Sequence, residues 1–171
     1  MTDEPEALPE DSQGEEEGEQ EGTSACFLDT NILVYAVSSR APLHQRASEE
    51  LQRRHESGQE LWVSRQVLRE YLAALSRPQT YSQPKPIREL VADVRFFLRH
   101  FRIAEEGPAV TEKLLELLEG REGGGKQIHD ANVVATMLVH GIPALLTHNV
   151  RDFARFADVI RVLPLEKEEE S

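Results

Sequence analysis

The 171-residue chain has little of several features that would place it in a special class of protein. It has one cysteine, Cys26, so no disulfide can form within the chain, and its apolar surroundings predict a buried, unreactive thiol. No apolar run approaches the roughly 18 residues that a membrane-spanning helix needs. The first residues, Met1–Glu6, lack the basic and apolar regions of a secretory signal. We therefore expect one cytoplasmic domain of ordinary size with a hydrophobic core.

Basic residues are scarce at the two ends of the chain. Residues 1–22 contain ten acidic residues and no Lys or Arg, and residues 166–171 contain four acidic residues and one Lys. Residues 23–165 retain 17 acidic and 18 basic residues, so the net charge of −12 arises from the ends. A domain with this balance permits a polyanionic substrate without demonstrating one.

The composition of the N-terminal segment predicts disorder. Residues 1–22 have almost no large apolar side chains with which to offset the entropy of ordering, so we expect a disordered acidic tail. A solvating tail is the simplest interpretation, and the alternatives are a mis-assigned start codon and a regulatory tail that mimics nucleic acid. The domain is expected at residues 23–165, followed by a short acidic tail at 166–171.

Short apolar runs alternate with helical patterns along the domain. Strands are predicted at 26–29, 61–63, 101–104, 142–147 and 159–162, and helices at 32–37, 43–57, 64–76, from Pro86 onward, 108–119 and 129–140. Strands that alternate with helices are typical of an α/β fold with a parallel sheet. In the helix after Pro86, apolar residues recur at helical spacing, namely Ile87, Leu90, Val91, Val94, Phe97 and Leu98.

An acidic residue stands at each of four places where a strand is predicted to pass into a helix. These residues are Asp29, Glu70, Asp130 and Asp152. Because the carboxyl ends of parallel strands form one rim of the sheet, we expect the four carboxylates to converge there. Like charges at close range repel, so such a group needs a cation, and Mg²⁺ and Mn²⁺ prefer oxygen ligands.

Each of these acids also has a simpler explanation. Asp29 and Asp152 would suit helix N-caps, and Glu70 could be a surface glutamate at the border of a buried face. Asp130 is the most informative, because helical geometry places it with the apolar stripe, on the first turn of the predicted helix. A carboxylate there is costly to desolvate unless something binds it, although N-capping is again an alternative.

Other patterns are weaker. Gly120–Lys126 has the spacing of a phosphate-binding GxxxxGK loop, but Gln127 replaces the Ser or Thr that binds Mg²⁺, and a predicted helix rather than a strand precedes it. A flexible loop that brings Lys126 near substrate is the simpler interpretation. The six histidines show no spacing typical of zinc sites, and Ser64 and Ser76 lack the context of a catalytic nucleophile.

With these residues identified, the chain resembles the PIN-domain ribonucleases, and most of all the VapC-type toxins of bacterial toxin–antitoxin pairs. The resemblance covers about residues 25–163. It is most specific at Phe27–Ala36 and Thr147–Phe153, is weaker at Ser64–Tyr71, and includes His129–Ala131. It implies a three-layer α/β fold with a central parallel sheet of about five strands in the order 3-2-1-4-5. The acidic N-terminal segment departs from the family pattern, since such proteins commonly begin close to the first strand.

The resemblance also implies an activity and a set of site residues. Asp29, Glu70, Asp130 and Asp152 would bind Mg²⁺ or Mn²⁺, and Thr30, Asn31, Thr147 and Asn149 would support the site by hydrogen bonds. The chain would then be the toxin of a toxin–antitoxin pair, a metal-dependent endoribonuclease that cleaves RNA phosphodiester bonds with a metal-activated water. RNA, a cognate antitoxin and a second copy of the chain are the partners to expect.

Two other functions remain open. A PIN-like domain could bind RNA or a protein without cleavage, which weak ligand geometry at Glu70 would favour. A phosphatase with Asp29 as its nucleophile is a third interpretation, but that chemistry usually requires a second Asp two residues later, where Asn31 stands. Arg88, Arg95 and Arg99 could contact an RNA backbone, although a solvated helix face is the simpler explanation for them.

Overall fold

The computed structural model describes residues 24–166. The acidic tail predicted at residues 1–22 lies outside the described residues, as does nearly all of the segment at 166–171. Within residues 24–166, the longest and most apolar helices still fall short of what is needed to span a membrane.

A parallel five-stranded sheet forms the centre of the domain, in the order β3-β2-β1-β4-β5. The strands are β1 (Cys26–Leu28), β2 (Leu61–Ser64), β3 (Arg102–Ala104), β4 (Ala144–Thr147) and β5 (Arg161–Pro164). The central strand β1 pairs with β2 on one side and with β4 on the other. The parallel sheet and the strand order implied by the resemblance are therefore confirmed.

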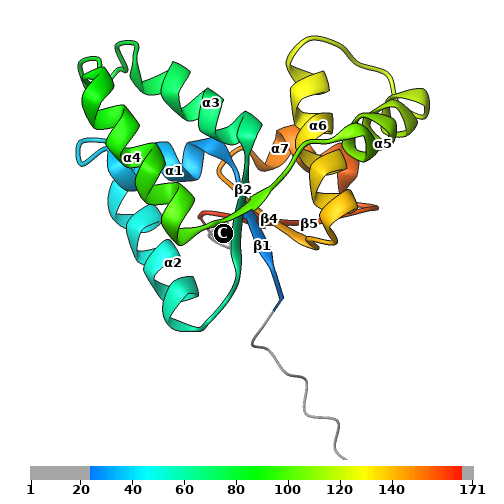
Figure 1. Cartoon of the computed structure of the whole chain (residues 1–171), viewed down its shortest axis with the longest axis horizontal. Helices are drawn as coiled ribbons and strands as arrows, with labels where there is room; N and C mark the ends of the chain where they lie inside the picture. Colours follow the sequence, from blue (N-terminus) through cyan, green and yellow to red (C-terminus); the bar gives the residue numbers. More distant parts are fainter. Residues whose placement is uncertain (1–23, 167–171) are drawn as a thin grey trace, which may run out of the picture.

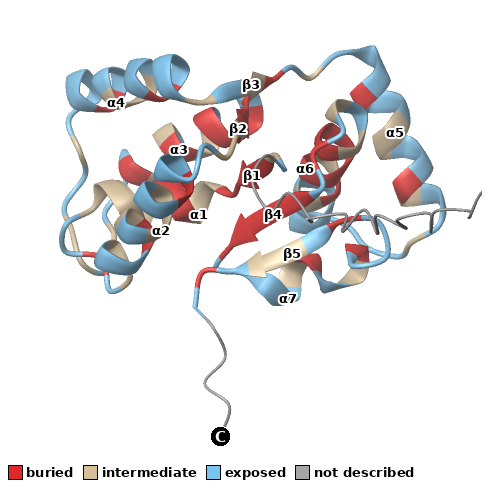
Figure 2. Ribbon diagram, turned by 90° about the horizontal axis from the view of Figure 1, so that it is seen from below, coloured by how far each residue is buried: buried red, intermediate tan, exposed pale blue. Residues whose placement is uncertain are grey.

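Two groups of helices flank the sheet (Figure 1). One group contains α1 (Thr30–Val37), α2 (His44–Glu56), α3 (Arg65–Leu75) and α4 (Ile87–His100); the other contains α5 (Pro108–Glu119), α6 (Lys126–His140) and α7 (Val150–Phe153), which continues into a 3₁₀ turn at Ala154–Phe156. Strands covered on both faces read as continuous apolar runs rather than as alternating ones. In agreement, every residue of β1 and β4 is buried (Figure 2), which confirms the three-layer α/β class.

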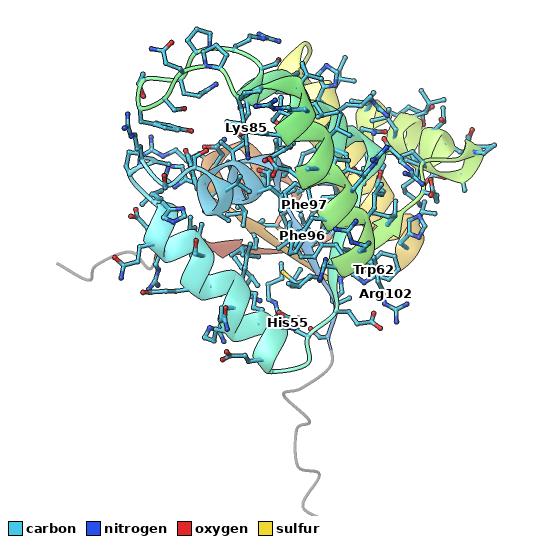
Figure 3. The ribbon with its side chains drawn as sticks, turned by 60° about the vertical axis from the view of Figure 1, so that its left-hand side comes forward. His55, Trp62, Lys85, Phe96, Phe97 and Arg102 are labelled. Carbon is cyan, nitrogen blue, oxygen red and sulfur yellow. The ribbon has the colours of Figure 1, made fainter. Side chains whose placement is uncertain are left out.

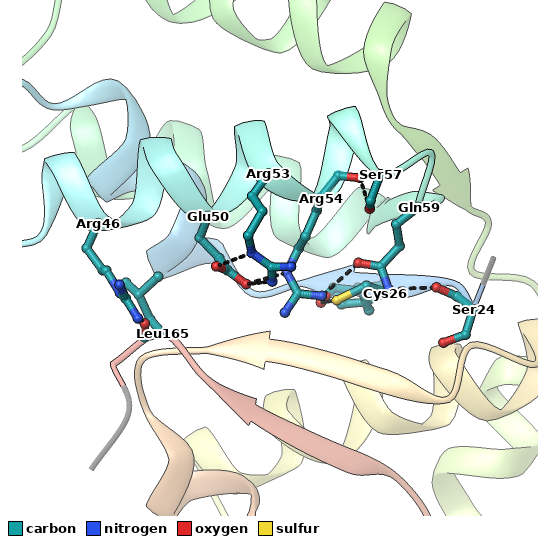
Figure 4. A network of polar contacts seen from close by, with 10 residues as sticks. Ser24, Cys26, Arg46, Glu50, Arg53, Arg54, Ser57, Gln59 and Leu165 are labelled. Carbon is teal, nitrogen blue, oxygen red and sulfur yellow. Dashed lines mark hydrogen bonds and ion pairs between the residues drawn. The ribbon is translucent and has the colours of Figure 1, made fainter. Parts of the chain in front are cut away.

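Cys26 is fully buried in β1, and this burial raises the pKa of its thiol, as expected for an unreactive cysteine. A buried charge lies close to it (Figure 4). Arg54 of α2 donates hydrogen bonds to Glu50 and to Gln59, both at 2.7 Å, and Gln59 donates to the Ser24 carbonyl oxygen at 2.8 Å. The paired guanidinium therefore connects α2 to the segment that enters the central strand.

One helix boundary differs from the prediction in a way that matters. Helix α6 begins at Lys126, three residues earlier than expected, so Asp130 lies on its second turn and cannot be its N-cap. Gly125 precedes the helix with a φ of 57°, a left-handed conformation that glycine adopts without strain. Lys126 and Gln127 are good helix formers, but the apolar periodicity does not extend to them. The apolar periodicity therefore predicted a start for α6 that is three residues too late.

The apolar stripe of α4 is buried only in part. Leu90 and Phe97 are buried, whereas Ile87, Val91 and Leu98 are 66%, 41% and 40% exposed. Phe97 packs edge-on against Tyr71 of α3, with 5.0 Å between the ring centroids. The neighbouring Phe96 is 48% exposed and stacks on His100. Figure 3 labels both phenylalanines on α4. The helix thus packs on the domain through Leu90 and Phe97 and leaves Ile87, Val91 and Leu98 in solvent.

Candidate functional site

Asp29 follows the last residue of the central strand and begins the first helix. One carboxylate oxygen, Oδ1, accepts the Thr30 backbone N–H at 2.8 Å, so Asp29 is indeed an N-cap. The other, Oδ2, accepts the Thr147 hydroxyl at 2.7 Å and the Asn31 side-chain amide at 3.0 Å. Asp29 is 8% exposed, and burial is the main cause that raises the pKa of its carboxyl. Capping accounts for one oxygen only, so it does not exclude a second role.

Thr147 and Asn31 hold this carboxylate from two segments that are far apart in the sequence. Thr147 ends β4, and its hydroxyl oxygen accepts the Asn149 backbone N–H at 3.0 Å and the Asn31 amide at 3.4 Å. The Asn31 side-chain oxygen accepts the His148 backbone N–H at 3.1 Å. The four residues expected to support the site therefore lie together, but Asn149 contributes through its backbone rather than its side chain.

Glu70 is half-buried on α3 and is held at both carboxylate oxygens. Oε2 accepts the Thr30 hydroxyl at 2.6 Å, and Oε1 accepts the Gln66 side-chain amide at 2.8 Å. Helix α3 begins after Ser64, whose hydroxyl accepts the Val67 backbone N–H at 3.3 Å, so Ser64 is the N-cap of the helix that carries Glu70. Glu70 is therefore not a free surface glutamate.

Asp130 on α6 and Asp152 on α7 face the same space. Burial raises the pKa of Asp130 to about 6; nearby Lys126 opposes this rise, and the charges of Asp152, Asp29 and Glu70 add to it. The Lys126 ammonium lies 2.5 Å from Oδ2 of Asp152, and this contact raises the pKa of Lys126. Four carboxylates and one ammonium are thus close enough to influence one another.

All four acids line one pocket of about 500 Å³. Thr30, Asn31, Asn149 and Lys126 also line it, together with Tyr35 and Tyr81. Arg88, Arg95 and Arg99 of α4 are exposed and are not among its lining residues within the described part of the chain. A larger depression of about 1520 Å³ lies beside this pocket, but Asp152 is the only one of the four acids that lines it. The smaller pocket is therefore the candidate site.

The donor set suits a hard divalent cation, but the side chains are not gathered around one point. Within residues 24–166, no three His, Cys, Asp or Glu side chains lie close enough together to hold a metal ion. Carboxylate oxygens are the ligands that Mg²⁺ and Mn²⁺ prefer, and the Lys126 ammonium occupies a position where a cation would neutralise Asp152. Metal binding would therefore require Lys126 to leave Asp152 and the carboxylates to move closer.

The sequence interpretation missed the polar residues beneath the acids. Gln66 stands four residues before Glu70, the spacing at which side chains meet on a helix, so this neighbour could have been found. Asn132 and Glu106 contact Gln66 from other elements, and no sequence spacing indicates those contacts. The segment between α3 and α4 also reaches the site, because Tyr81 lines the pocket.

Comparison with solved structures supports the fold. VapBC2 from Rickettsia felis bound to a promoter DNA fragment is 19% identical, with a TM-score of 0.59 over 82% of this chain and 98% of that chain. A toxin–antitoxin complex from Klebsiella pneumoniae is 22% identical, with a TM-score of 0.59 over 84% and 99% of the two chains. The Sarcin-Ricin loop cleaving toxin VapC20 of Mycobacterium tuberculosis is 21% identical, with a TM-score of 0.54 over 71% and 87%.

Comparison with protein families gives a more direct result. No curated protein matches the chain. The model of the PIN domain, however, matches residues 26–159, which include strands β1–β4 and all four acids; β5 begins just after the match, at Arg161. This match spans most of the chain and agrees with the strand order and the position of the pocket. The chain therefore belongs to the PIN-domain family.

Proposed function

We propose that this protein is a metal-dependent endoribonuclease in which Asp29, Glu70, Asp130 and Asp152 bind Mg²⁺ or Mn²⁺. The observation that carries the proposal is the meeting of four carboxylates, from four different elements, in one pocket at the carboxyl rim of a parallel sheet. Membership of the PIN-domain family supports nuclease activity. The mutual effect of these acids on the pKa of Asp130 supports a shared cation.

The protein's own part in the reaction is to hold charges in place. A bound metal ion would supply an activated water and stabilise the negative charge that develops on the scissile phosphate. Thr147, Asn31 and the Thr30 backbone fix the Asp29 carboxylate, and the Thr30 hydroxyl fixes Glu70. Asp130 or Asp152, which line the pocket from α6 and α7, would also orient the attacking water.

RNA is the proposed substrate, and a cognate antitoxin is the proposed partner, in the cytoplasm. VapC20 is a toxin that cleaves the Sarcin-Ricin loop, and the Klebsiella pneumoniae structure is a toxin–antitoxin complex. The exposed apolar side chains of Ile87, Val91 and Leu98, which share one face of α4, offer a surface for an antitoxin or for a second copy of the chain.

A domain that binds RNA or a protein without cleavage is the second candidate function. The observation that favours it is the ion pair between Lys126 and Asp152, together with the lack, within residues 24–166, of three side chains placed to hold a metal. In this alternative, Lys126 stays on Asp152 permanently and neutralises part of the acidic group.

Incubation of the full-length protein with labelled RNA separates these functions. We expect cleavage in Mn²⁺, none in EDTA, and none for Asp29→Asn in either condition. Asp158→Asn is the matched control, because Asp158 is exposed and pairs with Arg121 away from the pocket. RNA that is bound but remains intact in Mn²⁺ would instead support the non-cleaving domain, and intact, unbound RNA would refute both functions for that substrate.

A further inference from the structure

A polar network lies beneath Glu70 and connects it to α6. Gln66, on the first turn of α3, is 6% exposed and uses every polar atom of its side chain. Its Nε2 donates to Glu70 Oε1 at 2.8 Å and to the His129 carbonyl oxygen at 3.1 Å. Its Oε1 accepts Asn132 Nδ2 at 2.7 Å. The Gln66 amide is therefore held between a carboxylate of its own helix and two groups of α6.

A fifth carboxylate, that of Glu106, holds the other end of this network. One of its oxygens accepts the Gln66 backbone N–H at 2.8 Å, and the other accepts Asn132 Nδ2 at 2.9 Å. Glu106 lies between β3 and α5, so the network joins α3, α6 and the segment after β3. Glu106 is thus connected to Oε1 of Glu70 through two side-chain amides, those of Asn132 and Gln66.

The chemistry of the partners allows only one orientation of the Gln66 amide. Carboxylate and carbonyl oxygens accept hydrogen bonds and never donate them, so the NH₂ group of Gln66 must face Glu70 and the His129 carbonyl. A rotated amide would set its oxygen against both of them and leave the Asn132 NH₂ group facing another NH₂ group. Buried polar groups left without partners are costly, so the network resists this rotation.

We propose that Gln66 is a positioning residue for Glu70, and that Asn132 and Glu106 act through it by fixing its amide. The Gln66 amide holds one Glu70 oxygen while the Thr30 hydroxyl holds the other, so the remaining lone pairs of the carboxylate are directed into the pocket. Gln66 is not among the described residues that line the pocket, so its role is to act through Glu70. The inference rests on the proposed function, in which Glu70 is a metal ligand.

Mn²⁺ binding, measured by calorimetry on full-length proteins, tests this role without relying on activity. The variants are Gln66→Met, which keeps the length of the side chain and removes its amide, Glu70→Gln, and the two combined. We expect Gln66→Met to weaken Mn²⁺ binding about tenfold, as is typical when the partner of a metal ligand is lost. It should cause no further loss once Glu70 is replaced, because residues that act as a unit are not additive.

The chain offers a matched control and a second variant. Gln52 of α2 donates to Glu56 at 2.7 Å with the same helical spacing but on the surface, so Gln52→Met should leave Mn²⁺ binding unchanged. Melting curves establish that each variant is folded at the temperature of the titration. If Gln66→Met does not fold, Asn132→Leu takes its place with the same expectations, since it releases the Gln66 amide and leaves Gln66 and Glu70 intact.

The outcomes separate a failure of this inference from a failure of the proposed function. Wild-type affinity in Gln66→Met, together with weak binding in Glu70→Gln, would overturn the positioning role and leave the proposed function standing. An equal loss in both backgrounds would also overturn it, because Gln66 would then act independently of Glu70. Unchanged affinity in Glu70→Gln would remove Glu70 from the ligand set, and the proposed function and the inference would both fail.

Discussion

Replacement of Asp130 by Asn tests whether the pocket crowds negative charge. In the metal-free protein, burial and the three other acids raise the pKa of Asp130 from 3.8 to about 6. The ionised carboxylate is therefore less favourable in the folded than in the unfolded chain. Asn has nearly the same shape and no charge, so Asp130→Asn should remove this cost.

The magnitude follows from the two pKa values. A difference of about two corresponds to about 3 kcal/mol, since each pKa unit represents about 1.36 kcal/mol. Asp130 is only half-buried, and solvent screening lowers this upper limit, so we expect a gain of about 1–2 kcal/mol. Between about pH 4 and pH 6 the folded state binds more protons than the unfolded state, so the stability of the wild type falls as the pH rises through this window. The cost is small near pH 4 and complete above about pH 7.

Melting curves in EDTA measure this effect. Asp130→Asn should melt higher than the wild type at pH 8, by roughly 3–6 °C for a domain of this size, and the two should nearly coincide at pH 4. Added Mn²⁺ should raise the melting temperature of the wild type more than that of the variant, because it binds only the folded form. Asp93→Asn is the control of opposite sign, since Asp93 accepts hydrogen bonds from Tyr71 at 2.6 Å and Lys85 at 2.5 Å and stabilises the fold.

Two results would refute this reasoning. If Asp130→Asn is clearly less stable than the wild type at pH 8 in EDTA, Asp130 is a structural acceptor rather than a crowded charge. If the variant is more stable by the same amount at pH 4 and at pH 8, the gain does not come from the charge of the carboxylate.

Four further predictions address the other parts of the molecule. Asp29→Asn should abolish Mn²⁺-dependent cleavage and keep the circular dichroism of the wild type, because Asn also caps helices; unchanged cleavage would remove Asp29 from the ligand set. Lys126→Met should tighten Mn²⁺ binding in calorimetry, because the ammonium no longer competes for the carboxylates, whereas the surface variant Lys113→Met should not; weaker binding would contradict competition. Thr147→Val should lower the free energy of unfolding in a denaturant titration by about 1–3 kcal/mol, because a buried oxygen loses its donor, and an unchanged value would show that the hydroxyl bond is unimportant. A chain that begins at Thr23 should unfold at the same denaturant concentration as the full chain, and if the tail competes with RNA it should bind RNA more strongly, most of all at low salt; equal affinities of both chains at low and high salt would exclude such competition.

The strands and the meeting of the acids could be predicted because they depend on features visible in short stretches of sequence. The apolar run before Asp29 marks a strand covered on both faces, and the resemblance to a known family supplied the order of the strands. The start of α6 could not be placed, because Lys126 and Gln127 favour helix without contributing to an apolar stripe. The partial burial of α4 could not be predicted either, since periodicity identifies an apolar face but does not show whether another element covers it. The contacts of Glu106 with Gln66 and Asn132 could not be predicted, because they depend on tertiary packing.

The position of β1 at the centre of the sheet also determines when the pocket can form. Its two neighbours come from residues 61–64 and 144–147, and the hydrogen bond from Thr147 to Asp29 joins residues 118 positions apart. During translation, β1 leaves the ribosome early but must wait for β4 before it has both partners, and pairing over such distances is slow. A nascent chain that ends before Ala144 contains Asp29 but lacks the Thr147 hydroxyl that donates to its carboxylate. The pocket is therefore complete only after almost the whole domain has been synthesised.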